Sequence, residues 1–107
     1  MELSGRTAIV TGAARGIGRE IAGRLVAAGA ALAVVDVSDE AVAQAAEDLS
    51  RSGVASRGYR CDVSSFDDTA AVGERILADF GRVDILVNNA GITRDRLFVR
   101  MTAEDWG

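Results

Sequence analysis

Three glycines lie within seven residues near the start of the chain, in the run TGAARGIG at positions 11–18. An apolar run precedes this segment and a run with helical periodicity follows it, which predicts a strand, a tight turn and the start of a helix. Glycine allows the backbone to turn sharply after Gly12, to approach a ligand closely at Gly16 and to pack helix against strand at Gly18. The turn therefore fixes a strand-to-helix connection.

The helix that begins at this turn has unpaired backbone N–H groups and the positive end of its dipole, both of which favour an anion. A dinucleotide pyrophosphate suits that place. The glycine spacing is G-x-x-x-G-x-G rather than G-x-G-x-x-G, and glycine turns between strand and helix often serve packing alone. The turn by itself leaves ligand binding and packing both open.

Short apolar runs alternate with segments of helical periodicity along the rest of the chain. We expect the first helix to turn Ile17, Ile21, Ala22 and Leu25 toward the core, and another capped helix to begin near Thr102. The run at 54–61 is interrupted by glycine and polar residues, as in an edge strand. The expected strands are 7–11, 31–36, 54–61 and 84–88, and the expected helices are 16–28, 39–52 and a third that follows Ser64 and Ser65 and ends near Phe80.

Strands that alternate with helices of this length predict an α/β fold with a parallel sheet and right-handed crossovers. We expect a Rossmann-type doubly wound sheet with strand order 3-2-1-4, whose reversal opens a crevice at the carboxyl ends of the strands. The glycine turn, Asp36, Asp62 and the turn at 88–91 all follow strand ends. Their convergence on one edge favours ligand binding over packing alone.

Composition limits the other possibilities. A chain of 107 residues is one small domain, and its net charge of -4 argues against general nucleic-acid binding. No apolar run has the length of a signal peptide or a membrane span, so we expect a soluble, cytoplasmic protein without membrane attachment. Cys61 has no cysteine or histidine partner for a disulfide or a metal site, and we expect it to be a small structural residue at a strand end.

Three motifs occur in a characteristic order: TGAARGIG at 11–18, Asp62-Val63, and NNAG at 88–91. Together they resemble the classical short-chain dehydrogenase/reductase family. The further run GITRDRL at 91–97, with RMT at 100–102 and EDW at 104–106, is similar to the 3-oxoacyl-acyl carrier protein reductases within that family. The resemblance covers nearly the whole chain but only about the first half of such a reductase. It implies that residues 1–107 are the N-terminal portion of an NAD(P)-binding domain, ending within its fourth helix.

The resemblance also implies a nicotinamide cofactor along the crevice. Its pyrophosphate would lie over the glycine turn, its adenine ribose beside Asp36, its adenine near Asp62, and its nicotinamide beyond Asn89. As an alternative, Asp36 and Asp62 could cap local structure, and the NNAG turn could have only the structural role of holding loops against the sheet. The implied cofactor-binding residues are Gly12, Arg15, Gly16, Ile17, Gly18, Asp36, Val37, Asp62, Val63, Asn89, Ala90 and Gly91.

Two residues make opposite predictions about the cofactor. A carboxylate at Asp36 accepts both hydrogens of a ribose diol and repels a 2'-phosphate, which favours NAD. Arg15 stands where relatives that use NADP often have a basic residue. We expect NAD, with NADP as the alternative, because a close like-charge contact costs more than a mobile surface arginine contributes.

Catalytic residues cannot be assigned from the resemblance. The family uses a Tyr-x-x-x-Lys pair with a serine, whereas this chain has no lysine, and its one tyrosine, Tyr59, is followed four positions later by Val63. All 12 basic residues are arginines, whose pKa is too high for a general base. We therefore expect residues 1–107 alone to be inactive.

The leading hypothesis is the cofactor-binding half of an oxidoreductase that interconverts a carbonyl, such as a 3-oxoacyl thioester of fatty acid biosynthesis, and a secondary alcohol. The resemblance implies a tetramer at full length. Arg94, Arg96 and Arg100 could meet an acidic acyl carrier protein, although exposed arginines are usually only solvated. A non-catalytic nucleotide-binding module or truncated relic is the main alternative. A methyltransferase shares the glycine turn, but the NNAG turn does not suit it.

Overall fold

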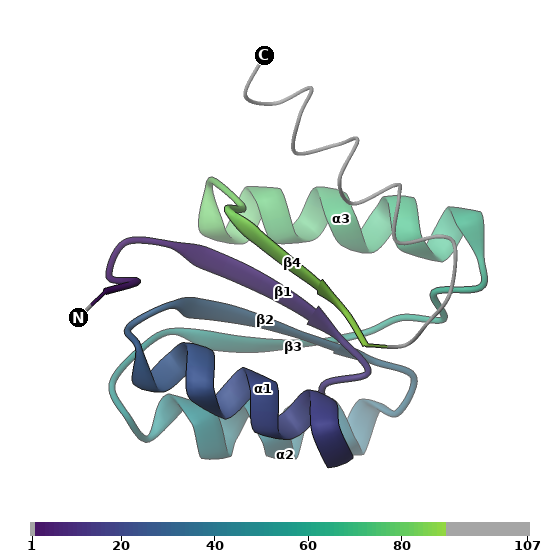
Figure 1. The fold of residues 1–107 in the computed structure, drawn as a ribbon. Helices are drawn as coiled ribbons and strands as arrows, with labels where there is room; N and C mark the ends of the chain where they lie inside the picture. Colours follow the sequence, from purple (N-terminus) through teal and green to yellow (C-terminus); the bar gives the residue numbers. More distant parts are fainter. Residues whose placement is uncertain (1, 90–107) are drawn as a thin grey trace.

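The computed structural model describes residues 2–89, which form a parallel β-sheet between two layers of helices (Figure 1). Helices and strands alternate along the chain, as the sequence predicts. The elements are β1 (Thr7–Thr11), α1 (Gly16–Ala27), β2 (Ala31–Asp36), α2 (Asp39–Ser50), β3 (Ser56–Arg60), α3 (Phe66–Phe80) and β4 (Ile85–Asn88).

The sheet has the order β3-β2-β1-β4, and all of its pairings are parallel. Thr11, the last residue of β1, pairs with Val35 on one side and with Asn88 on the other. The chain therefore leaves β1 toward one side of the sheet and later returns to its other side. This arrangement confirms the predicted Rossmann-type fold, including the reversal of strand order beside β1.

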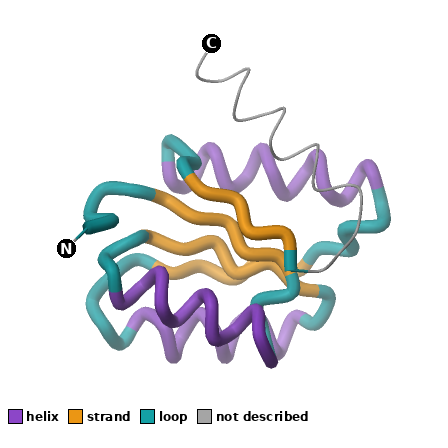
Figure 2. The backbone as a smooth tube through the Cα atoms, in the orientation of Figure 1, coloured by secondary structure: helices purple, strands orange, loops and turns teal. Residues whose placement is uncertain are grey.

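Helices α1 and α2 cover one face of the sheet and α3 covers the other (Figures 1 and 2). Each face has its own core, because alternate side chains of a strand point to opposite faces. Val10 and Leu32 pack with α1 and α2, whereas Ile9 and Val35 pack with α3. All residues of β1 are buried, as in a strand that is covered on both faces.

The start of α1 differs from the prediction. Ala22 is buried and Leu25 packs partly buried against the same core, as expected, but the side chain of Ile17 is 72% exposed. Gly18 is buried in its place, because its lack of a side chain lets the start of α1 lie against the backbone of Gly12. The predicted orientation of Ile17 was therefore wrong.

Local signals set the helix ends well. Ser38 caps α2 and Ser65 caps α3, each by accepting a hydrogen bond from a backbone N–H three residues on. Gly81, with φ of 81°, ends α3 in the left-handed conformation. The expected bounds of α1 and α2 were one or two residues too long, which is the usual uncertainty at frayed ends.

Strand β3 lies at an edge, as predicted, but it is shorter than the expected 54–61. Its glycine is a packing residue. A Cβ atom on Gly58 would lie 2.6 Å from the carbonyl oxygen of Val42 in α2, so only glycine lets this helix approach the strand so closely. Cys61 follows the strand and is buried, as expected of a structural residue.

A buried carboxylate joins the starts of β1 and β4. Asp84 accepts a hydrogen bond from the Thr7 N–H at 2.8 Å and further hydrogen bonds from the Arg82 guanidinium. The guanidinium of Arg6 lies 3.7 Å from Asp84 Oδ1. The side chain of Asp84 is only 6% exposed, whereas both arginines are more than half exposed. Asp84 thus ties together two strands that are far apart in sequence.

We expect Asp84→Ala to lower the free energy of unfolding by about 2–4 kcal/mol, because the buried Thr7 N–H loses its partner and the charged hydrogen bonds disappear. Chemical denaturation of the protein at pH 7 measures the effect. Glu20→Ala is the matched control. It breaks the ion pair between Glu20 and Arg24, whose side chains are 68% and 80% exposed. The control should cost less than about 1 kcal/mol. Equal losses in the two variants would contradict the role of Asp84.

The stabilisation by Asp84 should also depend on pH. Burial raises the pKa of Asp84, but hydrogen bonds from Arg82 and Thr7 and the charges of both arginines outweigh burial, so the pKa is below its usual 3.8. Because the pKa is lower in the folded state, the stabilisation is complete above the unfolded-state pKa, about 3.9, and is lost as the pH falls through the folded-state pKa. The difference between the wild type and Asp84→Ala should therefore shrink below about pH 4.

Candidate functional site

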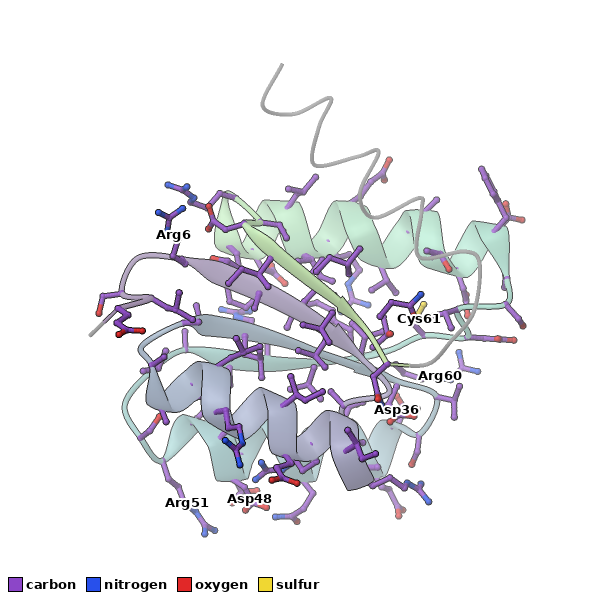
Figure 3. The ribbon with its side chains drawn as sticks, viewed as in Figure 1. Arg6, Asp36, Asp48, Arg51, Arg60 and Cys61 are labelled. Atoms are coloured by element: carbon purple, nitrogen blue, oxygen red, sulfur yellow. The ribbon has the colours of Figure 1, made fainter. Side chains whose placement is uncertain are left out.

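The predicted site residues gather where β1, β2 and β4 end. Asp36 closes β2, the glycine turn follows β1, and Asn89 follows β4. Figure 3 shows Asp36 at this end of the strands and Arg6 at the opposite end. The parallel sheet thus brings together segments that are widely separated in sequence, as the crevice at a reversal of strand order requires.

The three glycines of the turn have different roles. Gly12 and Gly16 adopt φ of 65° and 61°, which other residues rarely adopt. A Cβ atom on Gly16 would have nothing within 4 Å, so the backbone there is open to a ligand. A Cβ atom on Gly18 would lie 2.1 Å from the Gly12 carbonyl oxygen. Gly16 thus leaves space for a ligand, and Gly18 allows the helix to pack on the turn.

The start of α1 lacks the side-chain cap that α2 and α3 have. Arg15 occupies the N-cap position in an extended conformation, and its side chain makes no capping hydrogen bond. Arg15, Gly16 and Ile17 are all exposed. The first N–H groups of α1 and the positive end of its dipole therefore lie at the carboxyl edge of the sheet without a side-chain oxygen to satisfy them.

Asn89 links the end of β4 to the glycine turn. Its side-chain Nδ2 donates to the Gly12 carbonyl oxygen at 3.1 Å, and its backbone N–H donates to Thr11 Oγ1 at 3.2 Å. A Cβ atom on Gly18 would also lie 2.6 Å from this Nδ2. The sequence motifs do not predict this role of the Thr11 hydroxyl. Its position at the end of a buried strand, directly before glycine, was the available signal.

The Asp36 carboxylate touches the turn as well as its own segment. Its Oδ2 accepts from the Ala14 N–H at 3.0 Å, and its Oδ1 accepts from the Val37 N–H at 2.7 Å. The side chain of Val37 is 58% exposed next to it. Asp36 therefore does cap local backbone, which is one of its two predicted roles. It also lies at the carboxyl end of β2, in contact with the glycine turn.

Asp62 follows β3 and does not cap α3, since Ser65 does so. It accepts hydrogen bonds from the N–H and the hydroxyl of Ser64, at 3.0 and 2.5 Å, and these bonds lower its pKa below the usual 3.8. Val63 packs in the core beneath α3 and is 8% exposed. Of this motif, Asp62 is partly exposed and is therefore the residue that a ligand can reach.

Several predicted residues lie outside the described residues. These are Ala90 and Gly91, the three arginines at 94, 96 and 100, and the helix expected to begin near Thr102. Within residues 2–89, no group of three or more histidine, cysteine or acidic side chains is arranged to hold a metal ion. None of the helices in that range has both the length and the apolar character needed to cross a membrane.

The profile of the family described as short chain dehydrogenase matches residues 6–107. The chain belongs to the short-chain dehydrogenase family. This membership confirms the resemblance that the TGAARGIG, Asp62-Val63 and NNAG motifs indicated. Within the family, the chain corresponds to the N-terminal part of a longer protein.

Among the curated proteins, the chain is similar to the 3-oxoacyl-[acyl-carrier-protein] reductase FabG of Escherichia coli strain K12. The two are 47% identical over 106 residues, which cover 99% of this chain and 42% of that protein. The chain thus spans less than half the length of this relative. The similarity to 3-oxoacyl-acyl carrier protein reductases that the sequence indicated is confirmed.

Two solved structures of short-chain dehydrogenase relatives show the cofactors found in the family. A metagenomic short-chain oxidoreductase in complex with NADP is 30% identical with a TM-score of 0.89, covering 98% of this chain and 58% of that one. An NAD+-bound xylitol dehydrogenase is 35% identical with a TM-score of 0.78, covering 80% and 33%. Similar folds therefore hold either nicotinamide dinucleotide.

Proposed function

We propose that residues 1–107 bind the nicotinamide cofactor of an oxidoreductase that interconverts a carbonyl and a secondary alcohol. The observation that carries the proposal is the open backbone at Gly16, at the uncapped start of α1 and on the same sheet edge as Asp36. A pyrophosphate needs close backbone approach and N–H donors, and a ribose diol needs a nearby carboxylate. The described residues fit both needs.

The glycine turn would hold the pyrophosphate, with Gly16 and Ile17 donating backbone N–H groups. Asp36 would accept the hydrogens of the adenine ribose, Val37 and Asp62 would border the adenine, and Asn89 would line the way to the nicotinamide. When bound, the cofactor supplies or accepts a hydride. We infer that a Tyr-x-x-x-Lys pair outside residues 1–107 handles the proton of the alcohol, because these residues contain no lysine.

We propose NAD as the preferred cofactor. The Asp36 carboxylate lies at the end of β2 and would stand close to a 2'-phosphate, where two like charges repel strongly. Arg15 is exposed at the start of α1 and could attract such a phosphate. However, an ion pair of an exposed arginine contributes little binding free energy. The Asp36 contribution should therefore dominate.

The similarity to 3-oxoacyl-[acyl-carrier-protein] reductases supports a 3-oxoacyl thioester as the substrate class, with an acyl carrier protein as a partner. We further propose that the full-length protein acts in fatty acid biosynthesis in the cytoplasm and assembles as a tetramer. Arg94, Arg96 and Arg100 are the candidate contacts for an acidic carrier. A non-catalytic nucleotide-binding module is the alternative. NAD(P)H oxidation by the full-length protein with a 3-oxoacyl thioester separates the two.

Calorimetric titration of the full-length protein with NAD and NADP tests the cofactor assignment. We expect the wild type to bind NAD at least about tenfold more tightly, which corresponds to about 1.4 kcal/mol. Asp36→Ala should weaken NAD binding and bring the two affinities together, because diol contact and phosphate repulsion disappear together. Asp39→Ala removes the same charge from the exposed first turn of α2 and should leave the ratio unchanged. Unchanged affinities for both cofactors in Asp36→Ala would show that this assignment is wrong.

A further inference from the structure

The first half of the glycine turn is tied to the end of β2 by two consecutive hydrogen bonds. The Ala13 N–H donates to the Val35 carbonyl oxygen at 3.2 Å, and the Ala14 N–H donates to Asp36 Oδ2 at 3.0 Å. One acceptor is backbone, which any residue supplies. The other is a side chain, so the position of Ala14 depends on the identity of residue 36.

The carboxylate is itself held in place. Its Oδ1 accepts from the Val37 N–H at 2.7 Å, and the Asp36 carbonyl oxygen accepts from the Cys61 N–H at 2.8 Å. Asp36 thus accepts one bond from the residue after β2 and one from the segment after β3, which anchor it, and a third from the turn. A carboxylate fixed in this way can hold the Ala14 amide at a defined position.

A ligand can use the same carboxylate without breaking these bonds. An ionised carboxylate has about four acceptor positions on its two oxygens, and the backbone N–H groups of Ala14 and Val37 occupy two. Two positions remain for the two hydroxyls of a ribose. The pyrophosphate turn and the ribose acceptor are therefore joined through one side chain.

We infer that Asp36 is a positioning residue for the pyrophosphate turn as well as a ribose acceptor, so that its carboxylate promotes binding even of nucleotides that have no ribose diol. The inference rests on the proposed function. The bond to Ala14 holds the turn before the ligand arrives, which reduces the ordering that binding must otherwise impose. Removal of the carboxylate therefore weakens the pyrophosphate contact, although Asp36 does not touch the pyrophosphate.

The test uses two probes, ADP and 2',3'-dideoxy-ADP, which share the pyrophosphate and differ in the diol. Each is titrated calorimetrically into the full-length wild type, Asp36→Ala and Asp39→Ala. We expect Asp36→Ala to weaken binding of the dideoxy probe about tenfold and binding of ADP by more. A tenfold loss of affinity corresponds to part of one charge-assisted hydrogen bond. Asp39→Ala should bind both probes as the wild type does. If the dideoxy probe binds the wild type and Asp36→Ala equally while ADP is weakened, the carboxylate acts on the diol alone and the inference fails.

Amide hydrogen exchange gives a second readout that needs no ligand. In Asp36→Ala the Ala14 amide should exchange about tenfold faster, while the Ala13 amide, which donates to Val35, should keep its protection. A general loss of stability would raise the exchange rates of both amides. An unchanged exchange rate at Ala14 would overturn the inference. If the wild type binds neither probe while the Ala14 amide still exchanges faster in Asp36→Ala, the proposed function is contradicted. In that case Asp36 would still position the turn.

Discussion

Gly18→Ala is expected to destabilise the protein by about 3 kcal/mol or more and to abolish cofactor binding. The added Cβ would lie 2.1 Å from the Gly12 carbonyl oxygen and 2.6 Å from Asn89 Nδ2. Neither atom can move freely, because the first belongs to the turn and the second donates a hydrogen bond to it. The helix must shift away from the turn, which is overpacking at a site with little room to relax. Denaturation and NAD titration of the full-length protein measure the two effects.

Gly23→Ala in the same helix is the matched control. Its added Cβ would meet only the end of the flexible Arg19 side chain, at 3.5 Å. Alanine favours a helix interior over glycine by about 1 kcal/mol, so this variant should be as stable as the wild type or more stable. It should also bind NAD normally. If Gly18→Ala behaved like Gly23→Ala, the close contact between α1 and the turn would not exist in solution.

Gly16→Val is expected to raise the dissociation constant for NAD more than about a hundredfold, or 2.7 kcal/mol. The space above Gly16 is open, and a valine side chain would occupy it where the pyrophosphate must approach. The φ of 61° adds a cost to the fold as well, about 1–3 kcal/mol for a β-branched residue in that conformation. Stability and NAD affinity must therefore both be measured.

Gly53→Val separates these two costs. Gly53 has φ of 90°, also has open space around it, and lies between α2 and β3, away from the turn. It should lose stability much as Gly16→Val does but keep the wild-type affinity for NAD. Should the two variants bind NAD equally well, the glycine turn would have no role in holding the pyrophosphate.

Much of this fold could be predicted because its signals are local. Ser38 and Ser65 cap helices by bonding to amides three residues away, and Gly81 ends a helix through its own φ. The strands of the sheet are short apolar runs, and the alternation with helices restricts the topology to very few choices. The carboxyl ends of parallel strands share one edge, so the gathering of the glycine turn, Asp36 and Asn89 followed from the order of the elements.

The details of the site depend on contacts between distant segments. Ala14 and Asp36 are 22 positions apart, and Gly12 and Asn89 are 77 apart. No pattern within either segment encodes the other, because these pairs form only once the crossovers and the register of the sheet are in place. The tie between Thr7 and Asp84, also 77 positions apart, escaped prediction for the same reason.

The sequence by itself determined the order of the elements, the helix caps, the family, and the edge of the sheet where the ligand should bind. Each of these depends on neighbouring residues or on a short motif. Only the tertiary structure decided that Ile17 is exposed at the start of α1, why β3 needs Gly58, and how Asp36 holds the turn. Burial and close approach are properties of two surfaces in contact. Ile17 is exposed because the glycine at position 18 lets the backbone of Gly12 lie against the helix, which a periodic apolar pattern cannot reveal.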